Sequence, residues 1–319
     1  MLIAVTRRID SGALAQLEAL GELRYWDDDL PPTPEQLREL LSGVDGALTL
    51  LTDRIDGELL DSLPDLRVVS NLAVGFDNID VAACTARGVA ACTTPNVLTQ
   101  TTAEFALALI FAVARQIVPG ARAARDGEWK TWYPFRFLGR DLAGATLGIV
   151  GLGRIGRRLA EMAGGIGMDM IYADEYANAP EYRRVGLDEL YRTSDVISLH
   201  VPLTPETRGM IGPDALALMK PDAILINTAR GSVIDTSALV AALEAGMLGG
   251  VGLDVTDPEP LPADHPLYAF DRVTIVPHIA SATSVTRHQM SSLAAQNVVA
   301  VLSGTEPPHC LNPEVLKRG

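Results

Sequence analysis

The chain has 319 residues, of which 48% are hydrophobic and 21% are charged. These fractions are typical of globular proteins, so they exclude a disordered chain, and the length suggests about two domains. The formal net charge of -14 argues against nucleic acid and anionic lipid as partners, because both bind to basic surfaces. A small anionic substrate stays open, because a pocket sets its own local potential.

The cysteines Cys84, Cys92 and Cys310 form no CxxC pair and no even-numbered framework. They are therefore expected to be free thiols in a reducing compartment, without a zinc site. The N-terminal sequence MLIAVTRRID becomes charged too early for a signal peptide and predicts a first strand. The most apolar stretch, residues 103–114, contains Glu104 and is too short to span ~30 Å of hydrocarbon. We expect a soluble, cytoplasmic protein with no membrane partner.

Short apolar runs alternate with helical patterns in the first part of the chain. Strands are predicted at residues 2–6, 47–51, 66–72 and 89–92, and helices at residues 11–20 and 33–42. Pro34 suits the first turn of the second helix. Strands that are apolar throughout and are separated by helices indicate a parallel sheet covered on both faces.

A second series of six apolar runs follows. Strands are predicted at residues 146–150, 168–173, 196–201, 223–227, 250–255 and 273–276. Six strands with crossovers predict a doubly wound, dinucleotide-binding sheet, the Rossmann arrangement. A helix at residues 101–114 joins the two series, and a last helix at residues 286–302 is expected to return to the first domain. We therefore predict two α/β domains with a cleft between them, one of residues 1–98 and 284–319 and one of residues 99–283.

The sequence GLGRIG at residues 151–156 directly follows an apolar strand and opens a helical pattern. In that context Gly151 makes a tight turn, Gly153 lets a pyrophosphate approach the backbone, and Gly156 lets the helix pack closely on the strand. The free N–H groups of the helix N-terminus would bind the phosphates. The alternative is an ordinary turn between a strand and a helix.

Asp174 ends the next apolar run, 18 residues after Gly156. An acidic residue about 20 residues past the glycines is expected to bind the adenosine ribose hydroxyls. A carboxylate there would repel the additional phosphate of NADP, so we expect NAD(H) to be preferred and NADP(H) to be disfavoured. The alternative is that Asp174 only caps a turn.

Three ionisable residues follow later apolar runs: Arg230, Glu259 and His278. Singly, each has an ordinary explanation: a surface ion pair, a solvated carboxylate and a structural histidine. Together, at the strand ends where an open sheet binds ligands, they fit hydride transfer to a 2-keto acid. Arginine can bind a carboxylate with two hydrogen bonds. Histidine can donate a proton to the developing alkoxide, and a neighbouring carboxylate would favour its protonated form. No metal is required.

With these motifs the chain resembles the D-2-hydroxyacid dehydrogenase family, and it is most similar to the glyoxylate/hydroxypyruvate reductases of that family. The resemblance covers nearly the whole length and rests on the segments NLAVGFDNID, ACTTPNVLTQTTAEFALAL, GIVGLGRIGRRLA, HVPLTPETRGMI, INTARGSVID, GLDVTDPEPLPADHPL and PHIASAT. It implies a flavodoxin-like substrate domain beside the NAD-binding domain.

The resemblance also implies roles for particular residues. Arg230, Glu259 and His278 would be catalytic. The substrate carboxylate would lie at the backbone of Val74 and Gly75, with Leu51 nearby. The cofactor would be lined, besides the glycines and Asp174, by Thr102, Arg154, Ile155, Pro202, Thr207, Ala229 and Asp254.

The segment GEWKTWYPFRFLG, residues 127–139, resembles an arm that crosses the dimer in the glyoxylate/hydroxypyruvate reductases. The resemblance implies a homodimer in which Trp132 closes the partner's substrate site and favours a small 2-keto acid. The alternative is that Trp129 and Trp132 only pack at the dimer interface. One departure from the family pattern is Asp174, because those reductases often prefer NADP and carry a basic or hydroxyl residue there.

Two other functions stay open. One is a different D-2-hydroxyacid dehydrogenase, of the 3-phosphoglycerate or D-lactate type; the former would need an additional basic cluster near the pocket. The other is a non-catalytic NAD(H)-sensing binding protein, which turnover at ordinary enzyme rates, ~1–10³ s⁻¹, would reject. Formate dehydrogenase is disfavoured, because that branch pairs its histidine with Gln where this chain has Glu259.

Overall fold

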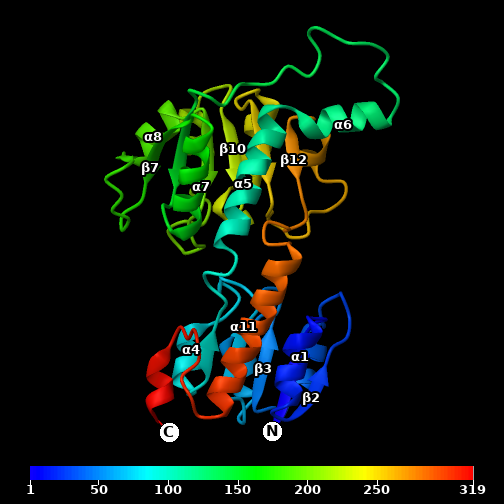
Figure 1. Ribbon diagram of the computed structural model, residues 1–319, viewed down its shortest axis with the longest axis vertical. Helices are drawn as coiled ribbons and strands as arrows, with labels where there is room; N and C mark the ends of the chain where they lie inside the picture. The colour runs from blue at the N-terminus through cyan, green and yellow to red at the C-terminus, as the bar shows by residue number, and fades with distance from the viewer. Residues whose placement is uncertain (319) are drawn as a thin grey trace. The chain divides into compact units, whose positions relative to one another are not determined.

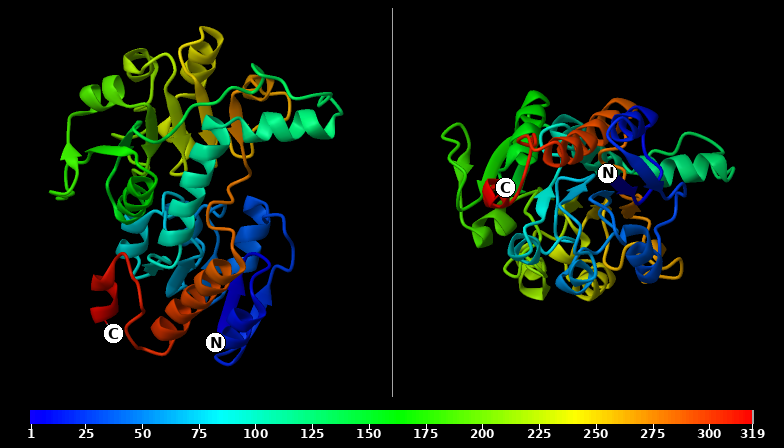
Figure 2. Two further views of the ribbon diagram at one scale, coloured as in Figure 1. Left: turned by 45° about the horizontal axis from the view of Figure 1, so that its top comes forward. Right: turned by 90° about the horizontal axis from the view of Figure 1, so that it is seen from below.

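The computed structural model describes residues 1–318 and divides into two compact units (Figures 1 and 2). Unit 1 consists of Met1–Leu98 and Ala282–Gly319, and unit 2 of Thr99–Ser281. Each unit contains one parallel β-sheet with helices on both faces. The predicted fold class, two parallel-sheet α/β domains, is therefore confirmed.

Unit 1 has a five-stranded sheet with the strand order β2-β1-β3-β4-β5, and all neighbours are parallel. This is the order of flavodoxin-like sheets. The strands are β1 (Leu2–Val5), β2 (Glu22–Tyr25), β3 (Gly46–Thr49), β4 (Val68–Asn71) and β5 (Ala90–Cys92). The three inner strands are buried along their whole length or nearly so, as expected for a sheet covered on both faces.

Helices of unit 1 cover both faces of this sheet. They are α1 (Ser11–Glu18), α2 (Pro34–Leu41), α3 (Gly57–Asp61), α4 (Val81–Ala86) and α11 (Ser284–Leu302), followed by the 3-10 helix η3 (Pro313–Arg318). Figure 2 shows α11 beside α1, and α11 also packs on β3 and β4. Side chains of α2, α3 and α4 form a core with the sheet. Each of the four short helices begins after an aspartate or threonine whose side chain accepts backbone N–H groups, the usual N-cap.

Unit 2 has a seven-stranded sheet with the order β12-β11-β10-β9-β6-β7-β8, again entirely parallel. Its strands are β6 (Thr146–Val150), β7 (Asp169–Ala173), β8 (Arg183–Arg184), β9 (Val196–Leu199), β10 (Ile224–Asn227), β11 (Gly250–Leu253) and β12 (Val273–Ile275). The chain first adds β7 and β8 on one side of β6 and then crosses to β9 on the other side. This is the Rossmann order, and its switch point lies between β6 and β9.

Two hydrophobic cores sandwich the sheet of unit 2. The helices are α5 (Thr99–Ala114), α6 (Ile117–Arg125), α7 (Arg154–Gly165), α8 (Leu187–Thr193), α9 (Pro213–Leu218) and α10 (Thr236–Glu244), with the 3-10 turns η1 (Gly231–Val233) and η2 (Pro266–Ala269). One core contains buried side chains of α5 and α7, and the other those of α8, α9 and α10. Within residues 1–318, no single helix is long and apolar enough to cross a membrane; α5 and α6 pass that test only as a pair bent by 64°.

The strands β2 and β8 are absent from the sequence prediction, and both lie at a sheet edge. β2 contains no buried residue, and both residues of β8 are exposed. An edge strand with one or both faces in water needs no apolar run, so it leaves no hydrophobic signal in the sequence.

Candidate active site

The glycine-rich turn lies at the switch point of the unit 2 sheet, between the end of β6 and the start of α7. Gly151 has φ +90°, and a Cβ atom there would lie 2.9 Å from the backbone of His200, which follows the neighbouring strand β9. Glycine alone tolerates both conditions. A Cβ atom on Gly156 would lie 2.4 Å from the carbonyl oxygen of Gly151. The first and third glycines are therefore required by close backbone contacts, as predicted from the motif.

The start of α7 fits the pyrophosphate of a dinucleotide. Gly153 is the N-cap residue, and no side chain among residues 1–318 accepts the first N–H groups of the helix in a cap. A Cβ atom on Gly153 would meet no described atom within 4 Å, so the space beside the turn is open. Arg154, in the first helical position, is exposed. Open N–H groups at a helix N-terminus are an anion site, so the residues present fit the predicted cofactor.

Asp174 directly follows β7 and is bound by three backbone groups. Its Oδ2 atom accepts the N–H of Leu152 at 2.8 Å, and its Oδ1 atom accepts the N–H groups of Tyr176 at 2.7 Å and Ala177 at 2.8 Å. The carboxylate therefore caps a turn, as the alternative interpretation held, and also ties that turn to the glycine loop. A carboxylate has about four acceptor positions, so capacity for a ribose hydroxyl is left.

Arg184 lies near the same turn, and the sequence analysis did not identify it as a site residue. It stands on β8, beside Tyr172 of β7, and its Nη2 atom donates to the carbonyl oxygen of Glu175 at 3.2 Å. Ten residues separate it from Asp174 in the chain, and only the pairing of β7 with β8 brings it close. A guanidinium here matters, because it is the group that would attract an additional phosphate.

The remaining predicted cofactor residues follow the carboxyl ends of β9, β10 and β11 or lie on the two helices of one core. Thr207 braces the turn after β9, because its hydroxyl donates to the carbonyl oxygen of Pro202 at 2.6 Å. The N–H of Ala229, after β10, donates to the side chain of Asn227 at 2.9 Å. The others are the buried Thr102 on α5, the partly buried Ile155 on α7 and the buried Asp254 after β11.

His278 and Glu259 form a close ionisable pair at this edge. The Nδ1 atom of His278 lies 2.6 Å from the Oε1 atom of Glu259, and both side chains are partly exposed. Glu259 belongs to the loop after β11, and His278 follows β12. The second ring nitrogen, Nε2, is therefore the one not engaged by this carboxylate. Such a pair fixes the orientation of an imidazole.

The backbone around His278 is held in an uncommon conformation. His278 has φ +53°, in the left-handed region that few residues other than glycine adopt. Its N–H donates to the carbonyl oxygen of Asp254 at 2.9 Å. The Asp254 carboxylate accepts the next two N–H groups, from Ile279 at 2.7 Å and Ala280 at 3.1 Å. The buried Asp254 therefore maintains the strained turn that presents the imidazole.

Arg230 lies three residues past the end of β10 and is close enough to Glu259 to lower the pKa of that carboxyl. Its neighbour Gly231 packs against the loop after β11, where a Cβ atom would lie 1.9 Å from the carbonyl oxygen of Thr256. Two hydrogen bonds join the same loops: Ser232 Oγ to Asp257 Oδ2 at 2.5 Å and Thr236 Oγ1 to the Asp257 carbonyl oxygen at 2.9 Å. These contacts bring Arg230, Glu259 and His278 to one edge of the sheet.

Burial and neighbouring groups shift the pKa values of two carboxylates at this edge, Glu259 and Asp254. Burial raises the pKa of Glu259, but the hydrogen bond and charge of His278, with a smaller contribution from Arg230, lower that pKa overall. Burial raises the pKa of Asp254, although the N–H groups of Ile279 and Ala280 oppose the shift. Glu259 is therefore ionised at neutral pH and carries the negative charge that faces the imidazole.

His200 lies at the switch point, and the sequence analysis did not select it. It follows β9; its N–H donates to the carbonyl oxygen of Val150 at 2.8 Å, and its Nε2 atom lies 2.9 Å from Ser198 Oγ. Burial lowers the pKa of His200 to about 4. It is therefore neutral at physiological pH beside the glycine turn. Its only sequence signal is its place at the end of an apolar run.

The predicted carboxylate-binding residues lie in unit 1, after two neighbouring strands. Leu51 follows β3, and Val74 and Gly75 follow β4. The Asn78 side chain joins these loops: its Nδ2 atom donates to the carbonyl oxygens of Leu50 at 3.1 Å and Asp53 at 2.8 Å.

Asn71 completes this brace of unit 1. Its Nδ2 atom donates to the carbonyl oxygen of Gly75 at 3.1 Å and to Asn78 Oδ1 at 3.0 Å. Both asparagines stand in the segment NLAVGFDNID, but the sequence analysis gave them no role, because amides that brace loops have no distinctive spacing.

Trp132 lies on the long loop between α6 and β6, which extends away from the helices of unit 2 (Figure 1). It is 82% exposed, and Trp129 and Phe135 on the same loop are similarly exposed. Arg136 stacks on Phe137 at 4.7 Å and pairs with Glu128, so the loop has internal order. The structure does not bring Trp132 together with the other predicted site residues of unit 2.

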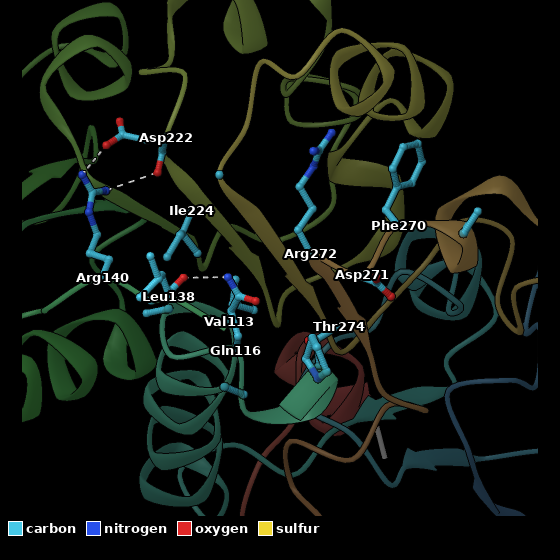
Figure 3. Close-up of a pocket in the computed structure, with 16 residues that line it drawn as sticks. Val113, Gln116, Leu138, Arg140, Asp222, Ile224, Phe270, Asp271, Arg272 and Thr274 are labelled. Atoms are coloured by element: carbon cyan, nitrogen blue, oxygen red, sulfur yellow. Dashed lines mark hydrogen bonds and ion pairs between the residues drawn. The ribbon is translucent and has the colours of Figure 1, made fainter. Parts of the chain in front are cut away.

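A cavity of about 570 Å³ lies in unit 2 (Figure 3). It is at the edge of the sheet opposite the one that holds Arg230, Glu259 and His278. Its lining includes Asp222 and Arg272, which precede β10 and β12, so it opens at the amino ends of these strands. Arg140 points toward Asp222 and pairs with it at 2.6 Å. None of the predicted site residues lines this cavity, and the charge of Arg140 is already neutralised.

Comparison with known proteins agrees with this fold. The family described as "D-isomer specific 2-hydroxyacid dehydrogenase, NAD binding domain" matches residues 107–280. The chain is 45% identical to a glyoxylate reductase of Korarchaeum cryptofilum over 321 residues, covering 99% of this chain and 97% of that protein. A crystal structure of a protein from Thermus thermophilus is 46% identical, has a TM-score of 0.92 and is matched over 98% of this chain and 100% of that one.

A further solved structure bears on the cofactor. An NADPH-dependent glyoxylate/hydroxypyruvate reductase from Sinorhizobium meliloti, in complex with NADP and malonate, is 30% identical, with a TM-score of 0.86 over 97% of this chain and 96% of that one. The match to an NAD-binding domain supports a nicotinamide cofactor, and the NADP complex of this relative leaves the choice between NAD and NADP open. The chain belongs to the D-isomer-specific 2-hydroxyacid dehydrogenase family and is an NAD(P)-dependent oxidoreductase.

Proposed function

We propose that this chain reduces a small 2-keto acid, glyoxylate or hydroxypyruvate, to the D-2-hydroxy acid and prefers NADH as cofactor. The observation that carries the proposal is the 2.6 Å contact between His278 Nδ1 and Glu259 Oε1 at the carboxyl edge of the unit 2 sheet. The glycine turn and Arg230 follow strands of the same edge. The glyoxylate reductase at 45% identity supports the choice of substrate.

In this proposal His278 donates the proton that the developing alkoxide requires. Because Nδ1 donates to the ionised Glu259, the proton that His278 gives to the substrate is the one on Nε2. Arg230 binds the substrate and polarises its keto group through the two-pronged geometry of the guanidinium. The nicotinamide, when bound, supplies the hydride.

The substrate carboxylate is proposed to accept the backbone N–H groups of Val74 and Gly75, with Leu51 nearby. The hydrogen bonds of Asn71 and Asn78 hold this loop in one conformation, so that its donors are oriented before the substrate arrives. Donors that are ordered in advance bind an anion at a lower entropic cost.

The NADH preference rests on Asp174. The carboxylate directly follows β7 and would repel a 2′-phosphate at this place. Arg184 acts in the opposite direction, and the relative from Sinorhizobium meliloti is NADPH-dependent. The expected preference for NADH is therefore moderate.

The test is a set of initial rates with NADH and with NADPH on hydroxypyruvate, glyoxylate, pyruvate and 3-phosphohydroxypyruvate. The proposal expects the highest kcat/KM for hydroxypyruvate or glyoxylate with NADH. A higher value for 3-phosphohydroxypyruvate or pyruvate would replace the proposed substrate by that of a phosphoglycerate or lactate type of dehydrogenase. Failure of all four with both cofactors, with NADH binding intact, would favour a binding protein.

We further propose a homodimer in which the exposed arm crosses to a partner subunit and Trp132 closes the partner's substrate site. Clustered exposed aromatic side chains mark protein interfaces, and Trp129, Trp132 and Phe135 are 74%, 82% and 84% exposed. Sedimentation should give twice the chain mass for the native protein. Trp132→Ala should stay dimeric and accept bulkier keto acids. A monomeric native protein would refute the arrangement.

A further inference from the structure

Two of the three cysteines stand opposite each other in unit 1, although they are 218 positions apart in the chain. Cys92, the last residue of β5, and Cys310 form an isolated antiparallel bridge. The N–H of Leu311 donates to the carbonyl oxygen of Ala91 at 2.8 Å. That bond flanks the cysteine pair, so the two residues occupy a non-hydrogen-bonded position, where opposed Cα atoms are about 4.5 Å apart. Disulfides span Cα separations of about 4.4–6.8 Å.

The chain segment that carries Cys310 is fastened to β5 and its neighbours by side-chain amides. Asn312 accepts the N–H of Ala91 at 2.8 Å and donates to the carbonyl oxygen of Val89 at 2.9 Å. On the other side of the cysteine, the N–H of His309 donates to Asn297 Oδ1 of α11 at 3.0 Å. The register of the two thiols is thus fixed from both directions.

We propose that Cys92 and Cys310 are a redox-sensitive pair that hydrogen peroxide converts into a reversible disulfide, which fastens the C-terminal segment to β5. The reaction goes beyond the proposed reductase activity and does not depend on it. The reduced form agrees with the free thiols expected from the sequence, since both cysteines are free in the structure.

The chemistry balances with the peroxide as oxidant. The Cys310 thiolate attacks one peroxide oxygen; an S–O bond forms, the O–O bond breaks, and the leaving hydroxide takes a proton to become water. The Cys92 sulfur then attacks the sulfenic sulfur; the S–S bond forms, and the second hydroxide leaves as water with the Cys92 proton. Two thiols lose two electrons, and one peroxide becomes two waters.

The environment of each thiol suits its step. Cys310 is partly exposed and Cys92 is fully buried, so the oxidant reaches Cys310 first. The Cys310 thiol donates to Asn312 Oδ1 at 3.4 Å. The neighbouring Cys92 thiol lowers the pKa of Cys310, and the neighbouring Cys310 thiol, together with burial, raises the pKa of Cys92. Cys310 is thus the attacking thiolate, and Cys92 keeps its proton until the second step.

Cys84 is a built-in control. It is fully buried on α4, and burial raises its pKa to about 11. A buried, protonated thiol is inert toward peroxide in the folded protein. Oxidation of the native chain should therefore consume two thiols and spare the third.

The experiment treats the folded full-length chain with hydrogen peroxide, then blocks free thiols and digests it without reductant. We expect one peptide that links Cys92 to Cys310 in the wild type and in Cys84→Ser, with two of the three thiols lost. Unfolding of oxidised protein should need a higher temperature, by about 5 °C, because the link constrains the unfolded chain. Dithiothreitol should restore both thiols and the original midpoint.

Cys92→Ser and Cys310→Ser should show no linked peptide and no rise in the unfolding midpoint. Recovery of the wild-type chain with both thiols unmodified would overturn the proposal. So would a sulfinic or sulfonic acid on Cys310 without a link, a link that contains Cys84, or a link between two chains. Circular dichroism of each variant confirms that it is folded, and the wild-type result decides the matter if either variant fails to fold.

Discussion

The carboxyl edges of the two sheets are built from different chemistry. In unit 2, the loops after β10, β11 and β12 present Arg230, Glu259 and His278, whose side chains carry or exchange charge. In unit 1, the loops after β3 and β4 are joined by the neutral amides of Asn71 and Asn78, which bond to backbone carbonyl groups. The role proposed for the first edge is to move a proton, whereas the role proposed for the amides of the second edge is to hold backbone groups in place.

Because of this difference, substitutions at the two edges are expected to have different effects on kcat and KM. An interaction that acts only in the transition state lowers kcat when it is removed, whereas an interaction made equally with the ground state raises KM. Substitutions at the unit 2 edge are therefore expected to lower kcat, and those at the unit 1 edge to raise KM. A mixed outcome would show that the two edges do not divide the work in this way.

The largest effect is expected for His278→Asn. Asparagine tolerates the left-handed backbone conformation of residue 278, so the loss of the imidazole is not accompanied by a forced change of the turn. Without a proton donor, kcat should fall by about 10³-fold, within the range of general acid catalysis. Steady-state rates with saturating NADH and keto acid measure the loss.

Binding of NADH to this variant, followed by fluorescence titration, should be unchanged. The partner variant Glu259→Gln and the double variant complete a cycle in which the losses should be far from additive, because the two residues act as a unit. An active His278→Asn enzyme, within about tenfold of the wild type, would remove His278 from the chemistry.

Much of this arrangement follows from sequence patterns, for a physical reason. Strands that are largely buried are rich in apolar residues, so ten of the twelve strands in residues 1–318 leave a run in the sequence. The edge strands β2 and β8, which contain no buried residue, do not. Residues that follow such runs are brought to one edge by the parallel order of the sheet. The positions of Arg230, Glu259 and His278 could thus be anticipated from the ends of the apolar runs.

The second effect concerns the cofactor. Asp174→Asn keeps an oxygen that can accept the N–H groups of Tyr176 and Ala177 but removes the negative charge. We expect the preference for NADH over NADPH to narrow by about tenfold, which corresponds to ~1.4 kcal/mol. The ratio of kcat/KM for the two cofactors measures it.

Arg184→Ala is the matched variant on the neighbouring strand. It should weaken the use of NADPH and leave that of NADH unchanged, because only the former has a 2′-phosphate for the guanidinium. If neither variant changes the ratio, the adenosine ribose does not lie at the end of β7.

The third effect is smaller and belongs to unit 1. Asn78→Ala removes the two hydrogen bonds that the Asn78 side chain donates to the loop after β3. The loop of Val74 and Gly75 should then be less ordered, so KM for the keto acid should rise about fivefold to tenfold, in keeping with ~1 kcal/mol for a lost hydrogen bond, with little change in kcat. Asn178→Ala, an exposed position of unit 2, serves as the control. A fall in kcat at constant KM would contradict the comparison of the two edges.

Several contacts of the site have no counterpart in the sequence pattern. Arg184 reaches the Asp174 turn only through the pairing of two strands, and Cys310 reaches Cys92 only after the chain has passed through all of unit 2. The amides of Asn71 and Asn78 satisfy backbone groups whose positions depend on the folded loops. Such partners are set by tertiary geometry, so spacing along the chain carries no record of them.

The smallest effect is a pH dependence of stability that also differs between the edges. In unit 2, burial lowers the pKa of His200 to about 4, below its usual value of about 6.5. The folded state therefore binds a proton less readily than the unfolded state, and stability present above about pH 6.5 is lost as the pH falls toward about 4. In unit 1, burial raises the pKa of Asp53, so its contribution has the opposite sign: it is greatest below the usual pKa and is lost as the pH rises.

Between about pH 7 and pH 5.5, His200 should cost the folded state about 1 kcal/mol. Comparison of the wild type with a His200 variant separates this loss from the contribution of Asp53. His200→Gln places an uncharged nitrogen near the Ser198 hydroxyl and cannot be protonated. The unfolding midpoint of the wild type should fall further than that of the variant between these two pH values, as followed by calorimetry. If the midpoints of the wild type and the variant fall equally with pH, the His200 ring is accessible to water in the folded state. The edge of unit 2 at the switch point would then be as hydrated as its surroundings.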